Sequence, residues 1–367
     1  MTIRIGINGL GRIGRCVARA VFENSSPYRG EVGRGADLPN NAPTLALPLM
    51  GRGLEEIELV AVNGPAEAAT HAHLLKYDSI HGRFAPSVSI DGENLKIAGK
   101  SVKLFHHKDP TLIPWGDLGV DFVLECTGKF NKKSDAEKHL QAGAKKVLIS
   151  APAEGVDSTI VYGVNNSALR AEHQVISVGS CTTNALAPLA KVLHEAVGIE
   201  HGFMTTIHSY TGDQNLVDGS HKDLRRARAA ALSMIPSTTG AAKTIGLILP
   251  ELKGRLDGTA IRVPTANVSL VDLTFTASRA TTKEEINEAL NKAANGELKG
   301  VLGTSSAPLV STDYNHTSES SNADLTGTFV TGGKLVRVAS WYDNEWGFSC
   351  RMLDVARLWA SLGAGMQ

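Results

Sequence analysis

Cys181 is the residue of this sequence best placed for nucleophilic chemistry. It stands in the stretch Ser-Cys-Thr-Thr-Asn at 180–184, between a strand predicted at 174–178 and a helix predicted at 185–197. The N-terminus of a helix favours the thiolate form of a cysteine, and its unpaired N–H groups can hold an oxyanion. Because its neighbours are small, polar and hydroxylic, Cys181 is predicted to be reactive, whereas the other three cysteines are expected to be buried and inert.

A glycine pattern at the start of the chain indicates a second kind of site. Gly9, Gly11 and Gly14 form G-x-G-x-x-G between a strand predicted at 3–8 and a helix predicted at 14–23. Glycines with this spacing permit a tight turn and a close approach of the backbone to a pyrophosphate, which the helix N-terminus then faces. The pattern is weak alone, but its place between a strand and a helix predicts a dinucleotide-binding turn.

The first half of the chain alternates short apolar runs with helical stretches. Runs at 59–63, 120–126 and 146–150 have the length of buried parallel strands. Such alternation predicts a parallel sheet covered by helices on both faces. We therefore expect an α/β protein whose N-terminal, dinucleotide-binding domain is a doubly wound sheet of the Rossmann type over residues 1–180.

The second half has a different character, with longer strand-like runs at 202–210, 259–264, 267–278 and 334–342. A helix is expected at 283–294. Together they predict an α+β catalytic domain over residues 181–343 on a mostly antiparallel sheet. A closing helix at 344–362 is expected to pack back on the first domain.

Residues 24–53 fit neither half of the chain. They are rich in Gly, Pro and Asn, and they separate the first helix from the second strand. A loop of this length is unusual inside a compact unit, but closing it costs little entropy. We expect a solvent-exposed insertion with no part in the chemistry.

The composition argues against several classes of protein. The 37 basic side chains balance the 37 acidic ones, which does not favour nucleic acid or a membrane surface as a partner. No apolar run approaches the ~20 residues of a membrane helix, and the first residues lack the order of a signal peptide. The four scattered cysteines form no CxxC pair, which argues against a zinc site and a disulfide framework. A cytoplasmic enzyme without a metal is expected.

Seven motifs together resemble the phosphorylating glyceraldehyde-3-phosphate dehydrogenases. They follow one another along nearly the whole chain, residues 24–53 excepted. The motifs are INGLGRIGR at 7–15, HLLKYDSIHGRF at 73–84, SCTTN at 180–184, HSYTGDQ at 208–214, HKDLRRARAAA at 221–231, TTGAAK at 238–243 and SWYDNEWGFSCR at 340–351. The resemblance implies that an NAD(P)-dependent enzyme oxidises D-glyceraldehyde 3-phosphate to 1,3-bisphosphoglycerate through a thioester on Cys181.

The resemblance also implies an acid–base partner and two anion sites. His208 would stabilise the Cys181 thiolate and take the hydroxyl proton of the thiohemiacetal. Hydroxyls, amides and a forked guanidinium suit phosphate oxygens. The substrate C3 phosphate is expected at Thr211, Arg262 and Asp213, the last orienting its neighbours. Inorganic phosphate is expected at Ser180, Thr182, Arg226, Thr239 and Gly240.

Further contacts with the cofactor follow from the same resemblance. The expected contacts are Arg12 and Ile13 with the pyrophosphate, Thr127 and Ser150 with the ribose and nicotinamide side, Asn344 with the nicotinamide amide, and Lys108 near the adenine.

Two positions predict that NADP is accepted as well as NAD, or instead of it. An acidic residue usually follows the second strand of such a fold, where it binds the adenosine ribose and would repel a 2′-phosphate. Here the residue is Gly64. In addition, Gly219-Ser220 resembles members of the family that use NADP, and Ser220 is therefore expected at the cofactor.

Three other functions stay open at this point. An erythrose-4-phosphate dehydrogenase is the closest alternative, although the stretch after the catalytic histidine, which those enzymes vary, is intact here. A nonphosphorylating aldehyde dehydrogenase would not need the phosphate site of Thr239 and Arg226. A third alternative is a protein of this fold used chiefly for binding RNA or a scaffold partner. The resemblance further implies a homotetramer, in which the loop at 209–234 borders the cofactor site of a neighbour.

Overall fold

The computed structural model describes residues 2–24 and 56–363 of the chain. Apart from Asn24, the predicted insertion at 24–53 lies outside the described residues. The chain forms two compact units. The first unit comprises Met1–Ile160, Ser167–Gly179 and Ser349–Gln367, and the second comprises Val161–Asn166 and Ser180–Phe348.

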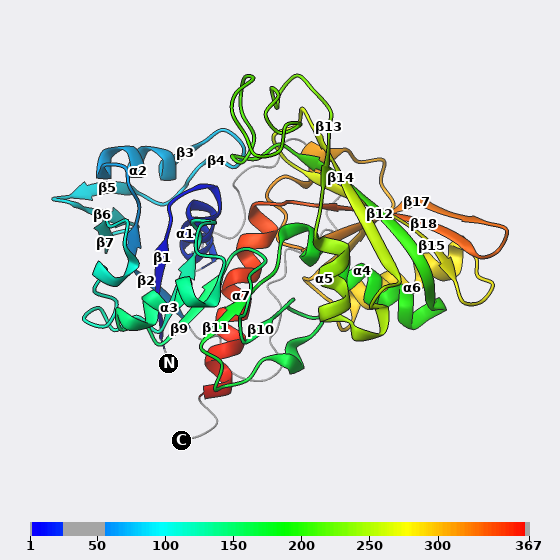
Figure 1. Cartoon of the computed structure of the whole chain (residues 1–367), viewed down its shortest axis with the longest axis horizontal. Helices are drawn as coiled ribbons and strands as arrows, with labels where there is room; N and C mark the ends of the chain where they lie inside the picture. The colour runs from blue at the N-terminus through cyan, green and yellow to red at the C-terminus, as the bar shows by residue number, and fades with distance from the viewer. Residues whose placement is uncertain (1, 25–55, 364–367) are drawn as a thin grey trace. The chain divides into compact units, whose positions relative to one another are not determined.

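The first unit is built on a nine-stranded sheet (Figure 1) in the order β10-β11-β9-β8-β1-β2-β7-β6-β5. The strands are β1 (Ile3–Asn8), β2 (Ile57–Asn63), β5 (Val88–Asp91), β6 (Asn94–Ile97), β7 (Lys100–Phe105), β8 (Phe122–Glu125), β9 (Lys146–Ile149), β10 (Ser158–Thr159) and β11 (Val175–Ser177). Every pair from β10 across to β7 is parallel. The central strands are the apolar runs identified in the sequence, which confirms the parallel sheet.

An antiparallel edge extends this sheet where no strand was predicted. β7, β6 and β5 pair antiparallel through short turns. Only one face of β6 and β7 is buried and β5 has no buried residue, so their apolar residues alternate with polar ones and form no continuous run. The separate hairpin of β3 (Tyr77–Asp78) and β4 (Gly82–Arg83) is also antiparallel.

Among the described residues, four α-helices belong wholly or mainly to the first unit. They are α1 (Arg12–Asn24), α2 (Ala68–Lys76), α3 (Lys133–Gln141) and α7 (Trp346–Gly363), with a 3-10 turn at Pro110–Leu112. Trp359 of α7 is fully buried, packs against Phe122 of β8 and donates its indole N–H to the Arg170 carbonyl at 3.0 Å. The last helix of the sequence thus supplies core side chains to a unit that begins with the first strand.

The second unit carries a seven-stranded sheet in the order β13-β14-β12-β15-β18-β17-β16. The strands are β12 (Ile199–Ser209), β13 (Ile235–Thr238), β14 (Leu256–Val263), β15 (Ser269–Ala277), β16 (Leu302–Ser305), β17 (Ser321–Thr331) and β18 (Leu335–Tyr342). Only the β12–β14 and β16–β17 pairs are parallel. The predicted α+β unit with a mostly antiparallel sheet is confirmed.

Three α-helices cover one face of this sheet (Figure 1): α4 (Cys181–Val197), α5 (Ala241–Ile248) and α6 (Lys283–Asn295). Along β15, buried and half-buried residues alternate without interruption, as expected for a strand packed on one face. α4 contacts β15, β17 and β18, so this helix packs over the central strands of the sheet. Within the described part of the chain, no helix has the length and apolarity needed to cross a bilayer.

Candidate active site

α4 begins at Cys181, four residues before the helix start predicted at 185, and this places the cysteine at a helix N-terminus, as its sequence context predicts. Ser180 caps the helix, because its hydroxyl oxygen accepts the backbone N–H of Thr183 at 3.0 Å. Gly179 precedes the cap with a φ of 71°, a conformation that favours glycine, and this lets the chain turn sharply into the helix. The thiol therefore stands at the positive end of a 17-residue helix.

His208 faces this thiol from β12. Its Nε2 lies 3.6 Å from the Cys181 Sγ, and its Nδ1 lies 2.7 Å from the Ser209 carbonyl oxygen. A carbonyl only accepts hydrogen bonds, so the Nδ1–H donates to it and the lone pair of Nε2 is directed at the sulfur. The predicted pair is thus assembled with the imidazole oriented as a base.

Arg262 adds a positive charge beside the pair. It lies opposite His208 in the parallel register of β12 and β14. Its Nη1 is 3.1 Å from the Ser209 carbonyl oxygen, 3.0 Å from the His208 Nδ1 and 3.5 Å from the Thr211 hydroxyl. Because Nδ1 already carries a hydrogen, the guanidinium donates to the carbonyl. Thr211 and Arg262, both expected at the C3 phosphate, are close neighbours.

Burial and Arg262 govern the ionisation of the pair. Burial, followed by the charge of Arg262, lowers the pKa of His208 to about 3, so its imidazole is neutral at neutral pH. Burial also raises the pKa of the Cys181 thiol, although Arg262 and the hydrogen bonds at the start of the helix act in the opposite direction. The start of the helix therefore favours the thiolate, as its sequence context predicts, but desolvation outweighs this contribution.

The two neutral groups can still share the proton. Moving it from Sγ to Nε2 would place a thiolate and an imidazolium 3.6 Å apart, and their attraction offsets part of the cost of burying both charges. The structure therefore favours proton transfer to His208 as the sulfur attacks, instead of a thiolate that exists independently of its partner.

Tyr342 supports the pair from behind and was not predicted. This fully buried ring packs edge-on against His208, with ring centroids 6.0 Å apart. Its hydroxyl lies 2.9 Å from that of Thr182 and 2.8 Å from that of Thr206. The Thr182 hydroxyl thus forms a hydrogen bond within the protein. Its contact with inorganic phosphate stays a prediction. Tyr342 is far from Cys181 in sequence, and only the pairing of β15 with β18 brings it near.

Residues assigned to two anion sites are joined to each other. Asp213 forms an ion pair with Arg226 and lies 3.6 Å from His221. Arg226 also donates to the Ser237 hydroxyl at 2.7 and 2.9 Å. Asp213 therefore orients a neighbour, as expected, but that neighbour is the arginine assigned to inorganic phosphate.

The remaining phosphate residues lie at the start of α5. Gly240 is the N-cap of this helix, and the Thr239 hydroxyl accepts the N–H of Ala241 at 3.2 Å. Gly240 is exposed. Helix N-terminal N–H groups can receive an anion, so this arrangement is compatible with the role expected of both residues.

The glycine turn of the first unit fits a dinucleotide. Gly9 has a φ of 100°, and a Cβ on Gly14 would lie 1.9 Å from the Gly9 carbonyl oxygen, so both positions require glycine. A Cβ on Gly11 would meet no atom within 4 Å, which leaves that side of the turn open to a pyrophosphate. α1 begins at Arg12, whose guanidinium is held by Asp78 at 2.5 Å. Ile13 lies in the first turn of the same helix.

A buried polar network supports the turn and was not predicted. The Asn8 amide donates to Glu125 at 2.6 Å, and the Nε2 of His139 lies 3.1 Å from the same carboxylate oxygen. The Trp115 indole N–H donates to the Nδ1 of His139 at 3.0 Å, so this histidine donates from Nε2. The other oxygen of Glu125 accepts the backbone N–H of Thr127 at 2.7 Å and also its hydroxyl. The network fixes Thr127 at the end of β8.

The other predicted cofactor residues are dispersed over both units. In the first unit, the Ser150 N–H donates to the Glu125 carbonyl at 3.0 Å, and Lys108 is exposed after β7. In the second unit, Ser220 is exposed, while the buried Asn344 accepts hydrogen bonds from the hydroxyls of Ser209 and Ser269, both at 2.8 Å. The side-chain oxygen of Asn344 is thus fixed by β12, which carries His208, and by the first residue of β15.

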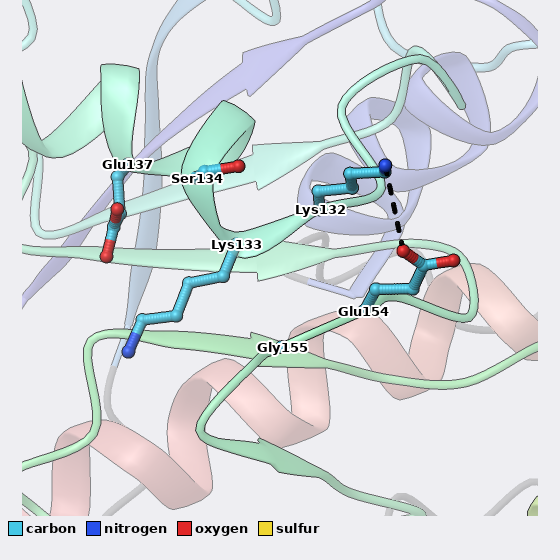
Figure 2. Close-up of a pocket in the computed structure, with 6 residues that line it drawn as sticks. All are labelled: Lys132, Lys133, Ser134, Glu137, Glu154 and Gly155. Carbon is cyan, nitrogen blue, oxygen red and sulfur yellow. Dashed lines mark ion pairs between the residues drawn. The ribbon is translucent and has the colours of Figure 1, made fainter.

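A separate hollow in the first unit contains none of the predicted residues. It is open to solvent, has a volume of about 510 Å³ and is lined by Lys132, Lys133, Ser134, Glu137, Glu154 and Gly155. Figure 2 shows Lys132 turned towards Glu154, with their charged atoms 3.8 Å apart, while Lys133 points the other way and pairs with Asp157 at 2.5 Å. Both lysines are already neutralised by carboxylates, so the hollow is a poor site for an anionic ligand.

A dinucleotide-binding turn on a parallel sheet, together with a cysteine–imidazole pair on a second unit, defines the class as a nicotinamide-dependent oxidoreductase with a nucleophilic thiol. Family models bear this out. Residues 47–133 match the glyceraldehyde 3-phosphate dehydrogenase NAD binding domain, and residues 180–344 match the C-terminal domain of the same enzymes. The chain belongs to the glyceraldehyde-3-phosphate dehydrogenase family.

Curated relatives cover nearly the whole chain. It is 54% identical to the chromosomal glyceraldehyde-3-phosphate dehydrogenase of Cupriavidus necator, over 97% of this chain and 98% of that one. It is 53% identical to the glyceraldehyde-3-phosphate dehydrogenases of Xanthobacter flavus and Geobacillus stearothermophilus, in each case over 99% of this chain and 100% of the relative.

Proposed function

We propose that this protein catalyses the NAD-linked oxidation and phosphorylation of D-glyceraldehyde 3-phosphate to 1,3-bisphosphoglycerate. The observation that carries the proposal is the 3.6 Å approach of the Cys181 Sγ to the His208 Nε2, beside the cationic Arg262. The relatives named above bear the name of this activity, and the chain contains every residue that the resemblance assigns to it.

The first half of the reaction forms a thioester. The Cys181 sulfur attacks the aldehyde carbon, and the thiol proton passes through the His208 Nε2 to the carbonyl oxygen, which gives a thiohemiacetal. Nε2 then takes the hydroxyl proton while the C–H bond breaks, and the carbonyl of a thioester forms. When bound, the nicotinamide ring accepts that hydride. We assign the pyrophosphate to the turn of Gly9, Gly11 and Gly14.

The second half of the reaction releases the product. A phosphate oxygen attacks the thioester carbonyl and the C–S bond breaks. The Cys181 sulfur regains the proton held on the His208 Nε2, and the attacking phosphate releases its own proton to solvent as the acyl phosphate leaves. We assign inorganic phosphate to Ser180, Thr182, Arg226, Thr239 and Gly240, and the C3 phosphate of the substrate to Thr211 and Arg262. The geometry supports the second assignment best, because the Nη1 of Arg262 already lies near the Thr211 hydroxyl.

A steady-state assay tests this proposal. With glyceraldehyde 3-phosphate and NAD, we expect sustained turnover only when inorganic phosphate is added. Turnover that does not depend on phosphate would indicate a nonphosphorylating aldehyde dehydrogenase. A higher kcat/KM for erythrose 4-phosphate would indicate the other alternative.

Arg262→Ala should weaken recognition of the substrate phosphate. Hydrogen bonds to charged groups contribute about 1.5–3 kcal/mol, so kcat/KM for glyceraldehyde 3-phosphate should fall roughly 10- to 150-fold. Unphosphorylated glyceraldehyde should be affected less, although Arg262 also acts on the charges of the pair. Arg262→Lys keeps the charge and separates the two effects. Equal losses for both substrates in both variants would contradict the assignment.

NADP is proposed as a second cofactor. Gly64 places no carboxylate after β2, and Ser220 is small and exposed. The assay above, run with each cofactor in turn, compares the two values of kcat/KM. A preference for NAD of about a thousandfold or more, equivalent to about 4 kcal/mol, would contradict NADP as a cofactor.

A homotetramer is proposed on the evidence of the segment between β12 and β13. It exposes Leu216, Val217, Leu224, Leu232 and Met234, each at 71% or more. Apolar side chains gathered on one exposed segment indicate an interaction surface.

Because the four cysteines form no disulfide in the described chain, a reducing, cytoplasmic setting is also proposed.

A further inference from the structure

His71 occupies the space that a side chain at position 64 would need. A Cβ built on Gly64 would lie 2.6 Å from the Nε2 of His71 and 2.8 Å from its Cε1. Real Cβ atoms do not approach other atoms so closely, so any larger residue at 64 must displace the imidazole. The residue type at position 64 and the position of the His71 ring on α2 thus depend on each other.

The pair lies at the end of β2, beside the glycine turn. The N–H of Gly9 donates to the Asn63 carbonyl at 2.9 Å, and a Cβ on Gly64 would lie 3.4 Å from that of Leu10. In dinucleotide-binding folds this point receives the adenosine ribose. Charged side chains at this point therefore act on the 2′-position of the bound cofactor.

Three basic side chains surround this point. His71 is only 4% exposed, and within the described residues neither of its ring nitrogens reaches a hydrogen-bond partner in good geometry. His106 donates from Nδ1 to the Gly64 carbonyl at 2.9 Å and is otherwise exposed. Arg15 of α1 donates to the Leu10 carbonyl at 2.9 Å.

The pKa of His71 shows how these groups act on one another. Burial lowers it, His106 and Arg15 lower it further by charge repulsion, and only the nearby backbone of Gly64 raises it. A bound dianion would relieve this repulsion and favour the protonated imidazole.

We propose that His71 determines cofactor preference, because its imidazole occupies the side-chain space of position 64 and, with His106 and Arg15, provides a positive site for the 2′-phosphate of NADP. This inference rests on the proposed function. It deepens that function by naming the residue through which the 2′-phosphate is distinguished.

Calorimetric titration of the full chain with 2′,5′-ADP and with 5′-AMP, which differ only in the 2′-phosphate, tests the positive site directly, without turnover. His71→Leu should weaken binding of 2′,5′-ADP about tenfold, as expected for the loss of one partly screened charge, and should leave 5′-AMP within about twofold. The matched control is His73→Leu on the same helix, where the histidine is exposed; it should change neither value. An unchanged ratio in His71→Leu, or a wild type that binds both probes equally, would overturn the proposal.

The steric coupling has its own test in thermal unfolding. Gly64→Ala should lower the Tm by about 3 °C or more, and most of that loss should disappear in a His71→Ala background but persist in a His73→Ala background. Equal losses in all three backgrounds would overturn the coupling. NAD- and phosphate-dependent activity is measured in the same proteins. It distinguishes a failure of the proposed function from a failure of the role proposed for His71. Its absence from the wild type contradicts the proposed function, whereas its presence with an unchanged probe ratio contradicts only the role of His71.

Discussion

Cys181→Ser should lower kcat/KM for glyceraldehyde 3-phosphate by about 10⁴-fold or more, because the loss of a nucleophile removes the whole covalent route. A serine hydroxyl at the start of α4 is far less nucleophilic and leaves poorly from the acyl intermediate. The helix should still form, since Ser180 and not Cys181 caps it. Steady-state kinetics and circular dichroism of the purified variant measure the two quantities.

A second cysteine provides the control for this substitution. Cys350 is buried in α7, where it plays no part in the proposed chemistry. Cys350→Ala should therefore retain activity within a few-fold, even if its Tm falls. Substantial activity in Cys181→Ser, or a comparable loss in both variants, would show that Cys181 is not the nucleophile.

His208→Asn should lower kcat/KM by about 10²- to 10⁴-fold, the usual contribution of a general base. It should also move the midpoint of the pH profile for alkylation by iodoacetamide upward by about 1 unit or more, because the thiolate loses the cation that stabilises it. The sign follows from the charges: an imidazolium 3.6 Å from the sulfur favours the thiolate, and an asparagine at 208 cannot become a cation.

The control for His208 lies on the same strand. His201 of β12 is exposed and lies 3.3 Å from the Thr276 hydroxyl, far from the thiol in the register of the sheet. His201→Asn should leave both the rate and the alkylation profile unchanged. An unshifted profile in His208→Asn would mean that the imidazole does not share the proton of Cys181.

The sequence was sufficient to predict the fold and the site wherever a local pattern determines the structure. The glycine spacing specified the turn before α1, and the small residues before Cys181 specified the sharp entry into α4. Apolar runs of strand length located the central strands of the first sheet, because strands buried on both faces contain few polar residues. Position 208 was assigned through family resemblance, since nothing in its local sequence distinguishes a catalytic histidine from a structural one.

What the sequence did not reveal depends on contacts between distant segments. Tyr342 reaches the pair only through the pairing of β15 with β18, and the Glu125–His139–Trp115 network joins three separate segments. The net rise in the Cys181 pKa could not be predicted from the sequence, because burial is a property of the folded unit. The contact between Gly64 and His71 could not be predicted either. A glycine in the sequence does not indicate which neighbouring residue occupies the space of its absent side chain.

Mass spectrometry of the acylated enzyme tests the central claim most directly. The protein is mixed with glyceraldehyde 3-phosphate and NAD without inorganic phosphate, quenched in acid and digested. We predict one NADH per active site, a phosphoglyceroyl adduct on the peptide that contains Cys181, and loss of that adduct when phosphate is added before the quench. Continued NADH production with Cys181 unmodified, or an adduct on another residue, would contradict the account.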